Sequence, residues 1–362
     1  MSFAFGFTGD DISDTEAPEV SVNTPQNPKS DQLSDHAVLQ PKFHSLDDLL
    51  HSLKNVRLTF DNYQTPNGNI VYRRQLFDIK HQVMTEEDEV SNEVHNILIG
   101  NTSDEVDVRK NVYEGGFKSW ECSYDLVDKL HTLYKEGELS QFRCLLELGC
   151  GTALPTCYLL MLLFGSPEKD SSASSNNSPP QENSPSTFIF SDFNFEVLRL
   201  VTLPNILIHY ASTLSPETLN ALMDSEVPLN NDELLLTPAL LNQFTSHLKQ
   251  RNLELRFISG SWGTDFLSLV SPYAPDLVVT SETIYSPESL PLISSMLIQL
   301  FAGKNLYLGL VAAKQYYFGV GGSIKEFLDH LNSNKPGSMT VSTTSDDLGQ
   351  LKRDIVQLRP ST

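Results

Sequence analysis

The chain has 362 residues, 40% of them hydrophobic, which is enough for one large α/β domain with appended segments or for two small domains. The formal net charge of −21 disfavours direct binding of nucleic acid or of acidic membranes; it favours a basic protein as partner or serves only to keep the protein soluble, and the charge alone does not decide between these two. The longest apolar run, Cys157 to Phe164, is too short to span a bilayer, and the N-terminus does not read as a signal peptide.

The N-terminal part of the chain differs in composition from the rest. Residues 1–44 are rich in Asp, Glu, Ser, Pro and Asn, and we expect them to form a disordered acidic tail. Residues 45–112 are predicted to form an extension with a short helix over 45–53. Apolar and polar residues then alternate on both sides of a Pro-Asn-Gly turn, which predicts a β-hairpin formed by 56–60 and 70–77.

The most informative stretch runs from Leu145 to Pro155. It predicts a buried parallel strand, a turn at Gly149 and Gly151 that lets a ligand approach the backbone, and a helix that begins with proline. A dinucleotide-binding turn needs a third glycine where this chain has Leu154. With Glu147 ahead of it, the turn instead resembles the first motif of seven-strand S-adenosylmethionine-dependent methyltransferases. A glycine turn that binds nothing is the alternative.

Downstream of this turn, strands and helices alternate, which predicts a parallel sheet with helices on both faces. Residues 165–187 form a low-complexity insert of Ser, Pro, Asn and Glu that we expect to be a disordered surface loop inside the domain 113–362. The four cysteines show no metal-ligand spacing, so we expect reduced thiols and no metal. The predicted strands are 144–148, 188–191, 253–259, 276–280 and 306–313, with a final hairpin in 338–358, and the predicted helices are 154–164, 195–202, 216–223, 238–250, 287–301 and 323–331.

Candidate segments follow the first four predicted core strands, and one more precedes the core. Because the carboxyl ends of parallel strands meet at one edge of a sheet, we expect these segments to lie close together. Once the insert is subtracted, Asp192 has the spacing from the glycine turn that is expected of a ribose-binding acid. After the third strand, the amides of Gly260 and Ser261 are expected to read the adenine edge while Trp262 packs on its face. The remaining candidates around this edge are Phe193, Asn194 and Ser281, and a segment that closes over the methionine end, namely Ser119, Trp120, Glu121, Cys122 and Ser123.

Longer motifs carry a more specific resemblance. The chain resembles the protein-histidine N-methyltransferases of fungi and animals, from its Phe-rich tip to about residue 331, with the insert and the residues after 332 matching less well. The resembling motifs are Tyr113–Gly116, Ser119–Cys122, Glu147–Gly151, Asp192–Asn194, Gly260–Gly263, Ser281–Tyr285 and Tyr317–Gly322.

The resemblance implies a seven-strand Rossmann-like sheet, mostly parallel with a final antiparallel strand, and S-adenosylmethionine as cofactor. It also implies methylation of the tele nitrogen of a histidine in a large-subunit ribosomal protein, and hence a role in ribosome biogenesis and translation. We expect a monomer in the cytoplasm and nucleus. Glu282 is the candidate catalytic carboxylate that fixes the imidazole tautomer, and Tyr285 the residue that positions the ring.

Several alternatives stay open at the level of sequence. Glu282 can bind backbone or cofactor instead, and Tyr285 can belong to the core. The glycine-rich loop 319–323, flanked by Tyr316, Tyr317 and Phe318, lacks the lysine of a phosphate-binding loop, so we expect it to lie over the target peptide. Rival functions are a lysine methyltransferase of the same fold and a non-catalytic chaperone or adaptor for a basic ribosomal protein.

Overall fold

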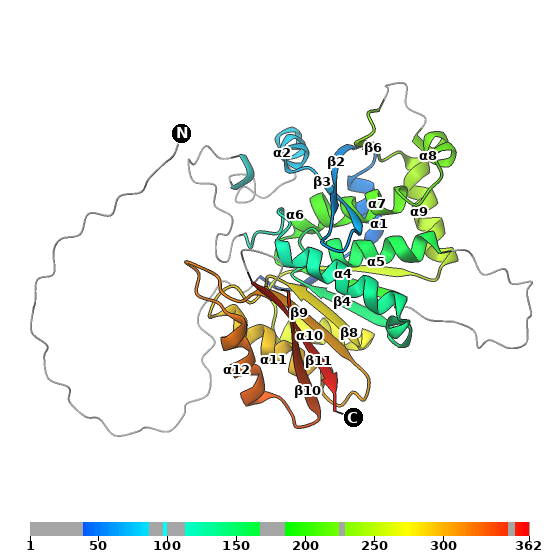
Figure 1. Ribbon diagram of the computed structural model, residues 1–362. Coiled ribbons are helices and arrows are strands. Elements are labelled where there is room, and N and C mark those ends of the chain that lie inside the picture. The colour runs from blue at the N-terminus through cyan, green and yellow to red at the C-terminus, as the bar shows by residue number, and fades with distance from the viewer. Residues whose placement is uncertain are drawn as a thin grey trace, which may run out of the picture. The chain divides into compact units, whose positions relative to one another are not determined.

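The centre of the fold is one large sheet (Figure 1). The structure is a computed structural model that describes residues 39–86, 97–99, 113–166, 185–223, 229–346 and 352–361. Within these ranges the sheet has eight strands, in the spatial order β1 (Lys42–His44), β7 (Glu254–Ser259), β5 (Thr187–Asp192), β4 (Cys144–Leu148), β8 (Leu277–Ser281), β9 (Leu308–Lys314), β11 (Arg353–Pro360) and β10 (Met339–Asp346).

The strand directions confirm the predicted fold class. The five strands from β7 to β9 are parallel, and β11 runs antiparallel between β9 and β10, as expected for a final reversed hairpin. The eighth strand, β1, was not predicted and pairs antiparallel with β7. The predicted tail 1–44 is therefore wrong at Lys42–His44, because the open edge of β7 takes up these residues as a strand. Residues 1–38 lie outside the described ranges.

Helices cover both faces of the sheet, as the alternation of strands and helices predicts (Figure 1). One face packs against α4 (Glu121–Lys135), α5 (Leu154–Gly165) and α7 (Leu203–Ala211), and the other against α10 (Thr264–Val270), α11 (Ser289–Phe301) and α12 (Ile324–Asn334). All of β4 is buried: Leu145 points to the first face, and Leu146 and Leu148 point to the second. Each such leucine contributes about 1.5–3 kcal/mol through burial. Both faces are thus closed, which leaves the carboxyl edge for a site.

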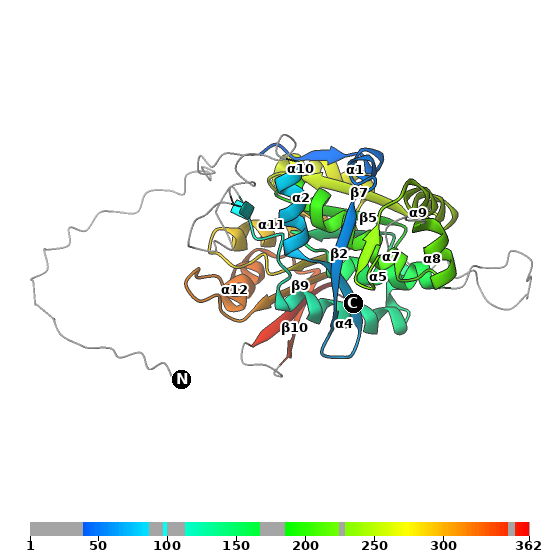
Figure 2. The ribbon, with the colours of Figure 1, turned by 90° about the horizontal axis from the view of Figure 1, so that it is seen from above.

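A second, three-stranded sheet joins the extension to the main domain. It consists of β2 (Arg57–Gln64), β3 (Ile70–Arg74) and the unpredicted β6 (Glu233–Leu235). Figure 2, which is seen from above, shows β2 in front, next to α5 and α7, and β3 contacts both helices. Two side chains of α7 accept hydrogen bonds from the β3 backbone: His209 Nε2 from the Tyr72 N–H at 3.2 Å, and Asn205 Oδ1 from the Arg74 N–H at 2.8 Å.

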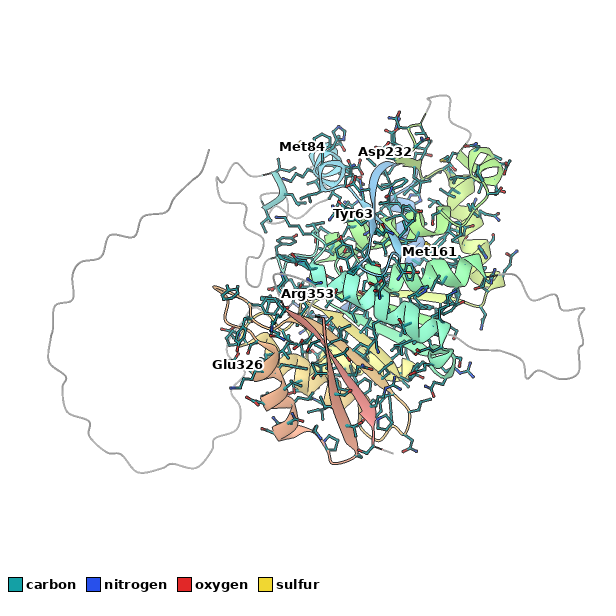
Figure 3. All side chains as sticks on the ribbon, viewed as in Figure 1. Tyr63, Met84, Met161, Asp232, Glu326 and Arg353 are labelled. Atoms are coloured by element: carbon teal, nitrogen blue, oxygen red, sulfur yellow. The ribbon has the colours of Figure 1, made fainter. Side chains whose placement is uncertain are left out.

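Apolar contacts reinforce this junction. Tyr63 on β2 and Met161 on α5, both labelled in Figure 3, pack against the same buried cluster around Tyr158.

A polar contact connects α4 to the large sheet. Figure 3 also labels Arg353 at the start of β11, whose guanidinium forms two hydrogen bonds to Asp125 of α4, at 2.6 and 3.1 Å. These two hydrogen bonds connect α4, which carries part of the site, to the first residue of β11 in the large sheet.

The remaining helices confirm most of the predicted helix bounds, but the strand predicted over 70–77 is wrong after Arg74, because a helix begins at Leu76. The two extra helices appear as predicted at α8 (Pro216–Met223) and α9 (Pro238–Gln250), the latter capped by Thr237, whose Oγ1 accepts the Leu240 N–H at 3.1 Å. In the described part of the chain no helix is long and apolar enough to cross a membrane. The other helical segments are α1 (Leu46–Ser52), α2 (Leu76–Thr85), α6 (Phe195–Val197) with a π-helical turn at Leu198–Thr202, and 3₁₀ turns at Glu138–Gln141 and Ser271–Tyr273.

Candidate active site

The predicted glycine turn connects β4 to α5 at the carboxyl edge of the sheet. Gly149 and Gly151 have φ values of 62° and 49°, in the left-handed region that favours glycine. A Cβ atom on Gly149 would lie 2.6 Å from Thr283 Cγ2, and one on Gly151 would lie 3.1 Å from the Gly116 carbonyl oxygen. Two other segments therefore press against the turn, and neither leaves room for a side chain.

Glu147, on β4 just before the turn, is a buried carboxyl group. It is only 2% exposed, and its Oε2 has no hydrogen-bond partner among the described residues. Burial raises the pKa of Glu147 to about 8. Burial and then the charge of Glu147 raise the pKa of the Cys157 thiol on α5. An orphaned carboxyl oxygen at this place fits a cationic ligand group better than an anionic one.

Asp192, at the end of β5, closes the same turn. Its Oδ2 accepts a hydrogen bond from the Gly151 N–H at 2.9 Å, and its Oδ1 accepts one from the Asn194 N–H at 3.2 Å. Burial nevertheless raises the pKa of Asp192 to about 6, because the loss of hydration outweighs these two hydrogen bonds. The predicted ribose acid thus lies beside the glycine turn, as its corrected spacing indicates.

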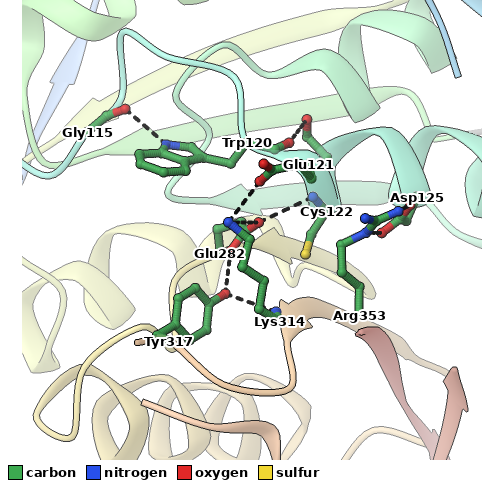
Figure 4. A network of polar contacts seen from close by, with 10 residues as sticks. Gly115, Trp120, Glu121, Cys122, Asp125, Glu282, Lys314, Tyr317 and Arg353 are labelled. Carbon is green, nitrogen blue, oxygen red and sulfur yellow. Dashed lines mark hydrogen bonds and ion pairs between the residues drawn. The ribbon is translucent and has the colours of Figure 1, made fainter. Parts of the chain in front are cut away.

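Glu282 occupies the centre of a polar network formed by four segments of the chain (Figure 4). Its Oε1 accepts the Cys122 N–H at 3.3 Å, and its Oε2 accepts the Tyr317 O–H at 2.5 Å. Lys314 Nζ, at the end of β9, lies 3.8 Å from Oε1. Glu282 has a φ of 58°, a left-handed conformation that costs a non-glycine residue about 1–3 kcal/mol. Such strain persists where the surroundings hold a functional side chain in place.

Lys314 and Trp120 form the outer part of this network. Lys314 Nζ pairs with Glu121 Oε2 at 2.8 Å and lies 5.5 Å from the centroid of the Trp120 ring (Figure 4). Burial alone would lower the pKa of Lys314, but its hydrogen bond to Glu121 raises it above the ordinary value. The Trp120 indole N–H donates to the Gly115 carbonyl oxygen at 3.2 Å, which holds the segment before α4 over the turn.

Tyr285 belongs to a different pair. Its hydroxyl donates to a carboxylate oxygen of Glu114, and that carboxylate also contributes to the raised pKa of Asp192. The two predicted catalytic residues, Glu282 and Tyr285, therefore have separate hydrogen-bond partners, although they leave the same strand three residues apart. The prediction that Tyr285 positions the imidazole remains a prediction.

The segment after β7 departs from the prediction. The Gly260 amide donates to the carbonyl oxygens of Asp192 and Phe193, both at 3.1 Å, and the Ser261 amide donates to the Leu39 carbonyl oxygen at 2.8 Å. The expectation that these two amides read an adenine edge is therefore wrong, because protein carbonyls already occupy them. The end of β5 occupies the Gly260 amide, and Leu39, which precedes β1, occupies the Ser261 amide.

Trp262 points back toward the glycine turn. Its Nε1–H donates to Ser191 Oγ at 3.0 Å, and a Cβ atom on Gly149 would lie 3.2 Å from its ring. Packing of Trp262 on an adenine remains a prediction that this position allows. Ser281 Oγ, at the end of β8, is buried and has no hydrogen-bond partner among the described residues.

The two serines of the segment ahead of α4 have local partners. Ser119 Oγ donates to Thr152 Oγ1 at 3.0 Å, which ties the segment to the glycine turn. Ser123 Oγ donates to the Trp120 carbonyl oxygen at 2.6 Å within the first helical turn. We read Ser123 as part of the helix start and Ser119 as a contact of the turn itself.

Three further residues take part in the site: Lys314, which was not predicted, and Glu114 and Tyr317, which the prediction named without a site role of their own, in the motifs Tyr113–Gly116 and Tyr317–Gly322. The rule that polar residues at the carboxyl ends of strands gather at one edge also covers the fifth core strand. The residues after that fifth strand are Lys314 to Tyr317, so the same rule would have found two of the three. Glu114 lies in a segment with no strand before it, and its signal is the motif Tyr113–Gly116.

The carboxyl groups around the glycine turn suit a positively charged ligand. Carboxyl groups of Glu147 and Asp192 lie beside the turn, and Glu114 lies next to Asp192. A pyrophosphate would be repelled by the carboxylates of Asp192 and Glu114, whereas an ammonium or a sulfonium group would be stabilised by them. The arrangement can therefore bind a cationic ligand beside a network that fixes one further carboxylate, Glu282.

Curated relatives are similar over most of the chain. The protein named histidine protein methyltransferase 1 of Saccharomyces cerevisiae is 42% identical over 362 aligned positions, which cover 92% of this chain and 91% of the yeast protein. The protein of the same name from Schizosaccharomyces pombe is 30% identical, with 96% of this chain and 91% of that protein covered. A homologue from Bos taurus is 32% identical over 64% of this chain and 52% of its own length.

Solved structures are similar only weakly. The rRNA methyltransferase aviRa from Streptomyces viridochromogenes has a TM-score of 0.36 and 14% identity, with 64% of this chain and 84% of that chain covered. The assignment of the fold rests on the strand order given above and not on this likeness. No protein-family model matches the chain.

Proposed function

The chain belongs to the family of histidine protein methyltransferases, and we propose that it transfers a methyl group from S-adenosylmethionine to the tele nitrogen of a histidine in a basic protein of the large ribosomal subunit. The enzyme class follows from the family. The ribosomal substrate is proposed because a chain with a net charge of −21 attracts basic partners, and ribosomal proteins are strongly basic.

We assign the binding of the methyl donor to the glycine turn and its acidic neighbours. Gly149 and Gly151 provide backbone without side chains, and the carboxyl groups of Glu147 and Asp192 lie beside it. When bound, S-adenosylmethionine supplies a methyl group made electrophilic by the neighbouring sulfonium. The carboxylates of Asp192 and Glu114 support a cationic donor at this place, and so does Oε2 of Glu147, which has no hydrogen-bond partner among the described residues.

Glu282 is the residue to which we assign the orientation of the acceptor. The unperturbed pKa of imidazole is about 6.5, so that neutral histidine, which is nucleophilic, is abundant at neutral pH. A carboxylate that accepts a hydrogen bond from the other ring nitrogen selects one tautomer and stabilises the imidazolium that develops. Glu282 is held on both oxygens by Cys122 and Tyr317, and each oxygen keeps a further lone pair for this bond.

The surroundings of Glu282 also exclude water. Cys122 and Tyr317 contact the carboxylate through hydrogen bonds, and Glu282 is itself buried. In such a site a fixed charge stabilises a developing positive charge more strongly than it would in water. We therefore propose that Glu282 orients an acceptor imidazole, which is neutral and nucleophilic at neutral pH. A lysine acceptor would instead need a base to remove the firmly held proton of its ammonium group.

A methyl-transfer assay tests the proposal. Large ribosomal subunits from cells that lack this enzyme are incubated with radiolabelled S-adenosylmethionine, and the hydrolysed protein is analysed for methylated amino acids. We expect label in tele-methylhistidine. Recovery of the label in methyl-lysine, or no label in the ribosomal fraction, would overturn the proposed substrate.

Two variants separate the assigned roles. Glu282→Gln keeps the shape and removes the charge, so we expect kcat to fall about 100-fold while the affinity for S-adenosylhomocysteine, measured by calorimetry, stays unchanged. Asp192→Asn is the matched variant at the turn, and we expect it to weaken S-adenosylhomocysteine binding about tenfold or more. Equal effects of both variants on ligand affinity would assign Glu282 to ligand binding instead.

A further inference from the structure

The loop between β9 and α12, residues 315–323, sits directly on the active-site segment. We call it the aromatic loop. Its Tyr317 hydroxyl donates to Glu282, and the Gly322 N–H donates to the Tyr285 carbonyl oxygen at 3.0 Å. A Cβ atom on Gly322 would lie 2.3 Å from the Ile284 carbonyl oxygen, so this contact needs glycine. The loop is thereby fixed to both predicted catalytic positions.

The aromatic loop is also closed by its own backbone. The Tyr317 N–H donates to the Gly322 carbonyl oxygen and the Gly321 N–H donates to the Tyr317 carbonyl oxygen, both at 3.0 Å. Tyr316 and Ser323 form a β-bridge at its base. Gly319 and Gly321 have φ values of 82° and 97°, which allow the tight return of the chain. Because this shape is already formed, a partner that binds the loop pays little entropy to order it.

The outward side chains of this loop are apolar and exposed. Tyr316 is 60% exposed, Phe318 83% and Val320 51%, and they alternate with the inward Tyr317. No residue of the loop carries a charge. Large apolar side chains that are exposed on a closed loop do not stabilise the folded chain, and such clusters commonly mark a binding surface. A rigid, uncharged, aromatic platform therefore lies beside the buried carboxylate.

The position of the platform indicates which molecule binds to it. The family acts on histidine within proteins, so a polypeptide segment must bring its imidazole to the active site. If Glu282 orients that imidazole, the residues next to the histidine pass the loop whose Tyr317 touches Glu282. We propose that Tyr316, Phe318 and Val320 bind apolar side chains of the substrate polypeptide on one side of the target histidine. This inference rests on the proposed function of Glu282 and adds how the polypeptide is held.

The test is a comparison of kinetic constants. The double variant Phe318→Ala with Val320→Ala is assayed for methyl transfer to ribosomal large-subunit proteins from cells that lack the enzyme. We expect KM for the protein substrate to rise about tenfold or more, with kcat and the affinity for S-adenosylhomocysteine unchanged. The matched control is Phe77→Ala, since Phe77 on α2 is 78% exposed and outside the loop, and it should leave all three constants unchanged.

The outcomes distinguish this inference from the proposed substrate. An unchanged KM in the double variant, or a fall in kcat alone, overturns the docking surface. If the ribosomal fraction accepts no methyl group even with the wild-type enzyme, the proposed substrate fails, and whole-cell protein from the same cells then serves as acceptor. In that assay the whole-cell protein is present below its saturating concentration. Equal labelling of it by the wild-type enzyme and by the double variant would also overturn the inference. Both substituted side chains are exposed, so the fold should tolerate their loss.

Discussion

Tyr317 donates a hydrogen bond from its hydroxyl to Oε2 of Glu282 across 2.5 Å, although the two residues are 35 positions apart. Burial and then the Glu282 carboxylate raise the pKa of Tyr317, so that its hydroxyl remains a donor at neutral pH. The loop after β9 thus holds the carboxylate that follows β8. The proposed catalytic group and the proposed docking surface are parts of one connected structure.

Removal of this hydroxyl should affect catalysis and not ligand binding. For Tyr317→Phe we expect kcat to fall about tenfold, because Glu282 loses the donor that orients it, while KM for the protein substrate changes less than twofold. Steady-state kinetics at saturating methyl donor measure both constants. The adjacent Tyr316→Phe removes an exposed hydroxyl and is the control. Equal kcat values for the two variants would contradict the positioning role of Tyr317.

Substitution of Gly149 should cost both stability and ligand affinity. Gly149→Ala places a methyl group 2.6 Å from Thr283 Cγ2 at a φ of 62°, so we expect a loss of about 2 kcal/mol or more in the free energy of unfolding. Gly303→Ala is the matched control, since Gly303 has a φ of 72° with open space around it, and we expect a loss of about 1 kcal/mol. Urea denaturation gives both values.

The same pair of variants also tests the site. Calorimetry with S-adenosylhomocysteine should show lost or strongly weakened binding for Gly149→Ala and unchanged binding for Gly303→Ala. Normal affinity in a folded Gly149→Ala protein would show that the ligand does not use this turn.

Glu147 should make the folded protein less stable as pH rises. Its pKa is raised to about 8 in the fold, so between about 4.5 and 8 the folded state keeps a proton that the unfolded state releases. Folding stability therefore falls with rising pH through this window, by about 3 kcal/mol at pH 7 if Glu147 alone is considered. Glu147→Gln removes this titration.

We expect Glu147→Gln to gain stability relative to wild type between pH 5 and pH 8, measured by urea denaturation without ligand. The gain should be accompanied by weaker S-adenosylhomocysteine binding, since the carboxyl group is kept for the ligand and not for the fold. A constant difference in stability over this pH range would refute the raised pKa.

His209 should have the opposite dependence. Burial lowers the pKa of His209 to about 4, with Nδ1–H donating to the Asn205 carbonyl oxygen and Nε2 accepting from the Tyr72 N–H. Between about 6.5 and 4 the unfolded state takes up a proton that the folded state does not, so stability is lost as pH falls through this window. The loss amounts to about 3 kcal/mol when complete.

His209→Gln lacks this titration and serves as the comparison. At pH 7 we expect wild type to be more stable by about 1–3 kcal/mol, because the substitution disturbs two buried hydrogen bonds. The difference should shrink as pH falls from 6.5 to 4. Denaturation curves at several pH values measure it, and a difference that does not change with pH would exclude His209 as the titrating group.

The sequence by itself determined the elements whose signals are local. The apolar run of β4, the glycines after it and the first-turn prolines of α8 and α9 are read within about ten residues, because strand burial, positive φ and helix capping are local properties. The order of strands and helices then placed Asp192 and Glu282 at one edge of the sheet. Subtraction of the insert recovered the spacing of Asp192.

Only the tertiary structure decided which polar groups meet. β1 and β6 are three residues long, too short for a periodic signal, and they form only because an open strand edge exists elsewhere in the fold. The pairing of β1 with β7 in turn placed Leu39 on the amide of Ser261, against the prediction for that segment. Glu282 receives its hydrogen bonds from residues 160 and 35 positions away. Such contacts depend on how distant segments close on one another, and no pattern within a single segment encodes them.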